Sequence, residues 1–174
     1  MKFLTAVCLV ALTFFVGCAD TETASTTPAA SNYDGSKFVL DAEPEGGLDI
    51  IAAREKIADG DEVVVVGRIG GSLNPWVKGR AAFYLVDPSL KACSDEKEDG
   101  EACSCTTPWD YCCETPKLPA AMAFVQFEED GNIVKHDAKE IFGLEELETV
   151  VVKGKAERTE GNLIIHASSF FVRK

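Results

Sequence analysis

The sequence predicts a mainly β protein, built around one small five-stranded barrel at residues 62–174. Runs rich in valine, isoleucine and aromatic residues recur along this part of the chain, and such runs are typical of strands. Turn-forming residues separate them. Between the third and fourth runs, residues 139–148 carry Ile141, Leu144 and Leu147 at three-residue spacing, which indicates a short helix. The predicted order is therefore β–β–insertion–β–α–β–β.

One further helix is expected just before the barrel, at residues 48–58. Ile50, Ile51 and Ile57 recur there at helical spacing, and Gly60 stands where a glycine cap would end the helix. The strands themselves follow from their β-branched and aromatic composition. They are predicted at residues 62–70, 80–86, 120–127 and 150–158, and the closing strand follows a turn at residues 159–162.

The predicted order of elements resembles the OB-fold, a five-stranded Greek-key barrel. Gly67 and Gly154 each follow a run of valines, as expected where strands curl to close such a barrel. An unrelated β-sandwich is the alternative fold. The resemblance implies a ligand face over the second and third strands, bordered by the loops that join strands one and two and strands four and five.

The first of these loops contains a tryptophan among cations. Aromatic and cationic side chains together suit stacking on a sugar or a nucleic-acid base. The net charge of −12 disfavours nucleic acid, because phosphate contacts need positive charge. In the alternative interpretation, Trp76 caps the barrel end and the cations are merely solvated. The candidate ligand-face residues are Arg68, Asn74, Trp76, Lys78 and Arg80.

The N-terminal part of the chain indicates export. Residues 1–17 have the layout of a secretory signal, in which Lys2 precedes an apolar run without charges. The ending FFVGC resembles the lipobox of bacterial lipoproteins, which implies that lipid on Cys18 anchors the protein to the cell envelope. An ordinary secretory signal is the alternative. Residues 18–36 are small and polar, so we expect a flexible tether before a single domain at residues 37–174.

Five of the seven cysteines lie in an insertion at residues 87–118, between the second and third predicted strands. An extracytoplasmic address favours disulfides. Two bridges, from the adjacent Cys112 and Cys113 back to Cys93 and to one member of the C-x-C pair, would staple the insertion and leave one cysteine over. The candidates for disulfide bonding or metal binding are Cys93, Cys103, Cys105, Cys112 and Cys113.

Two other interpretations of these cysteines stay open. Thiolates bind zinc or copper(I), although the C-x-C and C-C spacings are tighter than the knuckles of ordinary zinc sites. A redox-active pair is the third interpretation. Such a pair needs an electropositive setting that lowers the pKa of a thiol, and this segment is acidic.

Two aromatic residues, Trp109 and Tyr111, lie between the cysteines in the motif TPWDYCC. They either press the insertion onto the barrel or, if exposed, form a tip that contacts a partner. This motif, together with VVVVGRIGG and AAFYLVDPSLKAC, is similar to uncharacterised secreted or lipid-anchored proteins of planctomycete-type bacteria. That resemblance implies a recurring layout and no particular activity.

The sequence offers no catalytic constellation. His136 and His166 are distant from the cysteines, and the chain has no nucleophile elbow and no phosphate-binding loop. Our hypothesis is a non-catalytic, lipid-anchored extracytoplasmic protein that binds a protein or small molecule, without a cofactor. The alternative hypothesis is a metal-binding or thiol-redox protein that uses the cysteine-rich insertion, with zinc or copper as its ion.

Overall fold

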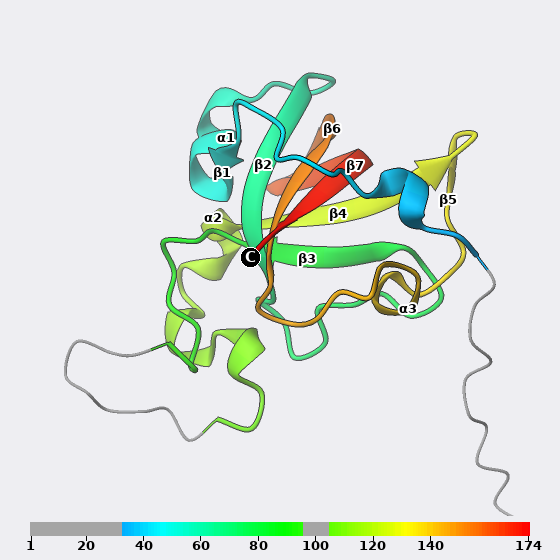
Figure 1. Ribbon diagram of the computed structural model, residues 1–174. Helices are drawn as coiled ribbons and strands as arrows, with labels where there is room; N and C mark the ends of the chain where they lie inside the picture. The colour runs from blue at the N-terminus through cyan, green and yellow to red at the C-terminus, as the bar shows by residue number, and fades with distance from the viewer. Residues whose placement is uncertain (1–32, 96–104) are drawn as a thin grey trace, which may run out of the picture.

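A computed structural model describes residues 33–95 and 105–174 (Figure 1). The predicted signal, Cys18 and Cys103 lie outside the described residues. Four residues before the predicted start of the domain at residue 37, the Tyr33 hydroxyl donates a 2.8 Å hydrogen bond to Glu129. The last residues of the predicted tether therefore already contact the domain.

Five strands close into a barrel, as the sequence predicts. Each strand pairs with its neighbour in the order β2–β3–β4–β7–β6, and β6 pairs back with β2. The pairs are antiparallel except for β4 and β7, which run parallel, so the barrel is mixed where an antiparallel set was expected. The strands are β2 (Glu62–Ile69), β3 (Ala82–Val86), β4 (Met122–Glu129), β6 (Thr149–Thr159) and β7 (Asn162–Arg173).

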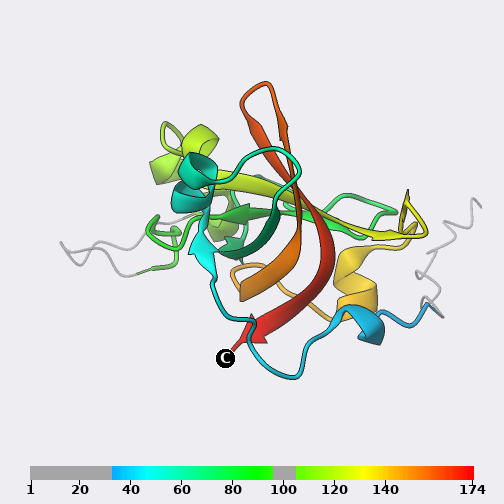
Figure 2. The ribbon, with the colours of Figure 1, turned by 90° about the horizontal axis from the view of Figure 1, so that it is seen from above.

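The architecture is an OB-like barrel, with a short helix between its third and fourth strands and one helix before the first. These helices are α3 (Ala138–Phe142) and α1 (Ile50–Lys56), and β5 (Asn132–Ile133) forms a hairpin with the end of β4. Figure 2 shows the long β6 and β7 curving together around the barrel. The remaining elements are η1 (Ser36–Phe38), β1 (Leu48–Asp49), η2 (Pro108–Asp110), η3 (Cys112–Glu114) and α2 (Leu118–Ala121).

Both predicted helices are shorter than their periodic patterns. At the start of α1, Leu48 and Asp49 pair with Val65 and Val66 as the two-residue strand β1. At the end of α3, Gly143 takes a left-handed conformation with φ of 65°, which ends the helix. Leu144 lies in the loop after α3 and is nevertheless buried in the barrel core. Among the residues that the structure describes, no helix is long and apolar enough to cross a bilayer.

The barrel interior is filled by alternate residues of each strand. In β4, Ala123, Val125 and Phe127 are buried, whereas the residues between them are half-exposed. Phe127 lies at the centre of an aromatic group, with ring centroids 5.2 Å from Phe38 and 5.5 Å from Phe170. Burial of each such side chain contributes about 1.5–3 kcal/mol.

A glycine allows the barrel to close. The register between β6 and β7 shifts between Lys153 and Gly154, so a β-bulge lies there. A Cβ atom at Gly154 would overlap the backbone of His166 and Ala167 in the neighbouring strand. The sharp bend of β6 against β7 therefore requires glycine, as the sequence suggested for this position.

Candidate functional site

The cysteine-rich insertion is attached to the barrel through a second, smaller apolar core. The segment that leads out of β3 contributes Leu90 and Ala92, and α2 contributes residues that lead the chain into β4. Asp87, which is buried, fixes the start of the insertion because its carboxylate accepts a 2.7 Å hydrogen bond from the backbone of Ile51 in α1. This core comprises Val86, Leu90, Ala92, Tyr111, Leu118 and Ala121.

Tyr111 is the largest residue of this core and is completely buried. It takes a left-handed conformation, with φ of 57°, between the turns η2 and η3. Its hydroxyl has no hydrogen-bond partner among the described residues, and burial raises the pKa of Tyr111 to about 12. Tyr111 therefore presses the insertion onto the barrel, and the predicted partner tip is wrong for this residue in the conformation described.

The insertion docks where β2 ends. The backbone N–H of Gly71 donates a 2.7 Å hydrogen bond to the carbonyl of Trp109, and Gly70 leaves room for this approach. A Cβ atom at Gly70 would lie 2.6 Å from that carbonyl oxygen. Arg68 on β2 adds a salt bridge of 2.5 Å to Asp95. The glycine pair of VVVVGRIGG is thus the docking point of the insertion.

Asp110 shapes the turn that carries the adjacent cysteines. One of its carboxylate oxygens accepts a 2.9 Å hydrogen bond from the Cys112 backbone, and the other accepts one of 2.9 Å from the Thr107 hydroxyl. Short side-chain bonds of this kind stabilise turns. The motif TPWDYCC therefore encodes the local geometry: Asp110 closes the turn and Tyr111 buries it.

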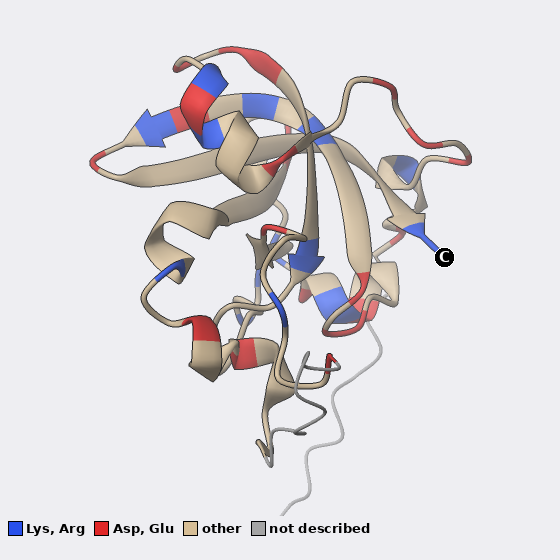
Figure 3. Ribbon diagram, turned by 90° about the vertical axis from the view of Figure 1, so that its left-hand side faces the viewer, with Lys and Arg blue, Asp and Glu red and all other residues tan. Residues whose placement is uncertain are grey.

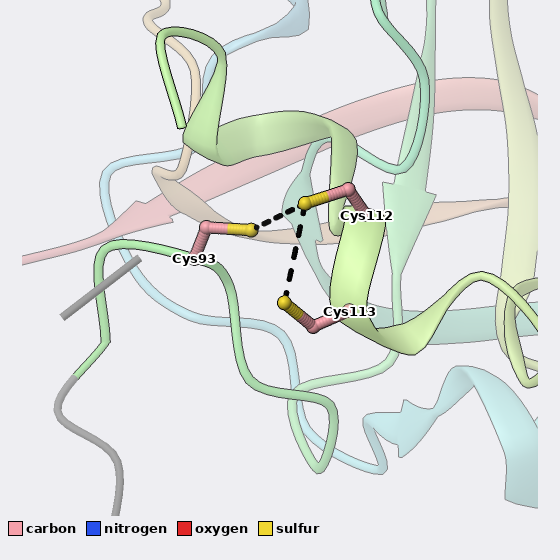
Figure 4. Close-up of side chains that lie close together, drawn as sticks. All are labelled: Cys93, Cys112 and Cys113. Carbon is pink, nitrogen blue, oxygen red and sulfur yellow. Dashed lines mark hydrogen bonds between the residues drawn. The ribbon is translucent and has the colours of Figure 1, made fainter. Parts of the chain in front are cut away.

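Four cysteine thiols converge on this turn. The Sγ atom of Cys112 lies 3.1 Å from that of Cys93 and 3.0 Å from that of Cys105. Cys113 lies 4.0 Å from Cys112 on the same turn. The sulfurs of Cys93, Cys112 and Cys113 all lie within 4.8 Å of one another (Figure 4). We refer to Cys93, Cys105, Cys112 and Cys113 as the thiol cluster.

The expected disulfides are not at bonding distance among the described cysteines. A disulfide bond is about 2.05 Å long. The Sγ atoms of Cys105, Cys93 and Cys113 lie 3.0, 3.1 and 4.0 Å from that of Cys112. The position of Cys103 lies outside the described residues. The structure thus brings together four of the five cysteines that the sequence singled out.

The thiol cluster lies at the surface in an acidic environment. Cys112 and Cys113 are exposed, whereas Cys93 is buried. Acidic residues occupy both neighbouring turns, Asp110 in η2 and Glu114 in η3 (Figure 3). A hydrogen bond with Cys105 raises the pKa of the Cys112 thiol, to about 11. Without a bound ion, Cys112 is therefore protonated at neutral pH.

The predicted ligand-face residues are distributed between two regions. Arg68 is held by Asp95 in the insertion. Trp76 packs edge-on against Phe83, and its indole N–H donates a 2.7 Å hydrogen bond to Glu146. The remaining three residues, Asn74, Lys78 and Arg80, are exposed on the loop between β2 and β3.

The outer face of the barrel carries a hollow that the sequence analysis missed. Tyr84 on β3 and Phe124 on β4 are cross-strand neighbours with ring centroids 5.1 Å apart. They contribute to a hollow of about 300 Å³, with Arg54 at its edge. In AMAFVQF, Gln126 marks the outward-facing register that Phe124 shares, whereas RAAFYLV is apolar from Ala81 to Val86 and gives no such signal for Tyr84. The other lining residues are Pro119, Met122, Ala123, Asn162, Leu163 and Ile164.

Both histidines contact neighbouring side chains of the barrel domain. His166 on β7 lies between two carboxylates, 2.7 Å from Glu128 on β4 and 2.7 Å from Glu157 on β6. Burial lowers the pKa of His166, but its hydrogen bonds to both carboxylates outweigh burial and raise this pKa above 6.5. His136 stacks on Tyr33, with ring centroids 4.7 Å apart. Neither contact lies in the thiol cluster.

Comparison with known proteins adds no family: no protein-family model and no curated protein matches the chain. The resemblance to lipoproteins therefore stays a prediction.

Proposed function

We propose that the protein is a lipid-anchored extracytoplasmic protein that binds copper(I) through its thiol cluster. The observation that carries this proposal is the position of Cys112, whose sulfur lies close to those of Cys93, Cys105 and Cys113. A disulfide joins two sulfurs, whereas a metal ion holds several around one point. Convergence of several thiols on one position supports a shared ion.

The sulfur separations support a metal ion of ordinary size. A tetrahedral zinc ion with bonds of about 2.3 Å keeps its sulfurs about 3.8 Å apart. Cys113 at 4.0 Å from Cys112 is close to this separation, whereas Cys93 at 3.1 Å and Cys105 at 3.0 Å lie closer and would each have to move away by less than about 1 Å. Small side-chain movements therefore suffice to bring these sulfurs around an ion.

The ligand set supports copper(I) rather than zinc. Soft thiolate ligands select copper(I), zinc or iron–sulfur clusters. Structural zinc sites use four ligands, usually from two knuckles of wider spacing, and copper(I) accepts two or three thiolates. Among the described residues, three of the four thiols, those of Cys93, Cys112 and Cys113, are mutually close, and such a set matches copper(I) with three thiolates. Exposure of two of these thiols gives the ion a path from solvent.

The experiment is a competition titration of the reduced full-length protein with copper(I), under anaerobic conditions, against a chromogenic copper(I) chelator. We expect about one equivalent per chain, and at least about tenfold weaker binding by Cys112→Ser. Thr106→Ser, an exposed change next to Cys105, is the matched control and should bind as the wild type does. Binding of less than about 0.1 equivalent would contradict the proposal, and preference for zinc(II) in a parallel titration would overturn the choice of ion.

The affinity for copper(I) should also rise with pH. A thiol must lose its proton to bind a metal ion, and the pKa of the Cys112 thiol is raised to about 11. Each proton released makes the apparent affinity up to about tenfold higher per pH unit. Titration at pH 6, 7 and 8 measures this slope, and an affinity independent of pH would argue against ligation by Cys112.

The anchoring part of the proposal rests on the sequence ending FFVGC and is tested separately. Acylation of Cys18 would attach the mature chain to the envelope, with the domain outside the cytoplasm. Mass spectrometry of the N-terminal peptide should find lipid on Cys18. A mature chain that begins beyond Cys18 would contradict the anchor and leave the metal proposal intact.

A second candidate function is binding of a small planar molecule in the hollow of the barrel face. The aromatic pair Tyr84 and Phe124 favours it, because such rings stack on planar ligands. A panel of nucleosides and sugars, followed by NMR chemical-shift mapping, should shift the signals of both residues. Tyr84→Ala should abolish the shifts, and shifts confined to the Trp76 loop would place the ligand elsewhere.

A further inference from the structure

We propose that Cys112 is the pivot of a thiol–disulfide switch that regulates the thiol cluster. This inference rests on the proposed metal site, and it concerns the same four cysteines. Its basis is that Cys112 has two neighbours at nearly equal distance, Cys105 at 3.0 Å and Cys93 at 3.1 Å. A bridge from Cys112 to one of them excludes a bridge to the other. Cys112 is therefore the shared member of two mutually exclusive disulfides.

The difference in exposure between Cys112 and Cys93 determines which thiol an oxidant reaches first. Cys93 is buried, with 4 % of its surface accessible, whereas Cys112 is exposed. An oxidant in solution therefore reaches Cys112 before it reaches Cys93. Because the two sulfurs lie side by side (Figure 4), Cys112 transmits oxidation from the surface to the buried thiol.

The chemistry requires a small-molecule disulfide as the oxidant. The Cys112 thiol first loses its proton to solvent, and the small fraction of thiolate so formed attacks one sulfur of this disulfide, forms a mixed disulfide and expels one small thiolate. The Cys93 or Cys105 thiolate then attacks the Cys112 sulfur, forms the internal bridge and expels the second small thiolate. Two cysteine thiols are oxidised, one external disulfide is reduced to two thiols, and the two cysteine protons pass to those thiols.

The two bridges interconvert without further oxidant. When Cys112 is bonded to Cys105, the Cys93 thiolate attacks the Cys112 sulfur and releases Cys105, and the reverse step restores the first bridge. Either bridge removes Cys112 and one neighbour from the ligand set. The ion consequently loses two of the four described sulfurs, and oxidation weakens its binding.

The test treats metal-free full-length protein with oxidised glutathione and maps the bridges by mass spectrometry of non-reduced peptides. We expect Cys112 in a bridge with Cys93 or Cys105 in the wild type. In Cys93→Ser, Cys112 should be bridged to Cys105, and in Cys105→Ser it should be bridged to Cys93. In Cys112→Ser, oxidation of Cys93 should be at least about tenfold slower because the relay is missing.

Thr106→Ser is the matched control, because Thr106 is exposed next to Cys105 and carries no thiol. This variant should keep both bridges of Cys112. Oxidation of Cys93 at the wild-type rate in Cys112→Ser, or bridges that omit Cys112 in the wild type, would overturn the switch.

The copper readout separates this inference from the proposed function. Oxidised and desalted wild-type protein should bind copper(I) at least about tenfold more weakly than reduced protein, and reduction should restore the original affinity. A reduced protein that never binds copper(I) refutes the proposed function, while the bridge map still decides whether Cys112 is the pivot. Full binding by protein that carries a Cys112 bridge would refute regulation of the site.

Discussion

The barrel and the insertion differ in how much apolar surface fixes their structures. The barrel core receives buried side chains from all five strands and from α1 and α3. The insertion is attached by a core of six residues that includes Tyr111, by the Gly71–Trp109 hydrogen bond and by the Arg68–Asp95 salt bridge. Stability in proteins is distributed in this uneven way, and segments with few buried contacts open first. The comparison predicts that the insertion can be released while the barrel stays folded.

The largest effect is expected from a change that attacks the barrel itself. Gly154→Ala places a Cβ atom against the backbone of His166, and neither backbone can yield without disturbing the β-bulge. We expect a loss of about 3 kcal/mol or more in the free energy of unfolding, measured by urea denaturation. Lys155→Ala, an exposed neighbour on the same strand, should change it by less than about 0.5 kcal/mol. A stable Gly154→Ala variant would mean that the bulge is not needed for closure.

A smaller and more local effect is expected from Tyr111→Ala. Removal of this buried ring should cost the insertion about 3 kcal/mol and should weaken copper(I) binding, while the barrel strands remain protected in hydrogen exchange. Tyr111→Phe removes only a buried hydroxyl that has no hydrogen-bond partner among the described residues, so stability should stay equal or rise. If Tyr111→Ala exposed the barrel amides together with those of the insertion, the two regions would form a single cooperative unit.

The smallest effect concerns pH and is confined to the barrel. The folded-state pKa of His166 is raised above 6.5, so its contribution to stability is complete below pH 6.5 and is lost as the pH rises through the folded-state pKa. Unfolding measured from pH 6 upwards should show a decline of less than about 1 kcal/mol. His166→Gln should flatten this dependence without changing the oxidation of the thiol cluster. A steeper decline of stability with pH in His166→Gln than in the wild type would mean that His166 stabilises the fold more at high pH, which is opposite to the expected effect.

The sequence predicted the barrel well because runs of β-branched and aromatic residues mark each strand, and turn-forming residues separate them. The turn at residues 159–162 lies where one such run ends, between β6 and β7. The ends of the helices were predicted less well. Leu144 and Leu147 continue the helical spacing, but Gly143 ends α3 before them, so burial of Leu144 comes from a loop. The spacing of apolar residues alone does not distinguish these cases.

The candidate site was predicted in part. The cysteines were identified from their concentration in one segment, but sequence spacing does not reveal that Cys93 and Cys112 meet across the insertion. Tyr111 was assigned to two opposite roles because its burial depends on the approach of Gly70 and Gly71 from β2. Long-range contacts of this kind require the fold. The predicted ligand-face residues lie in and beside the loop after the first strand. The hollow lined by Tyr84 and Phe124, which lie at outward-facing strand positions, was therefore missed.

Strand β4 separates the thiol cluster from the place where the N-terminal chain joins the domain. Tyr33 and Lys37, where the N-terminal chain joins the domain, both bind Glu129 at the end of this strand. The insertion leads through α2 into Met122, at the opposite end (Figure 1). Eight strand residues span about 24 Å. If the chain is anchored through Cys18 as proposed, the thiol cluster lies at the end of the domain away from the tether, where soluble donors and acceptors of metal ions could reach it.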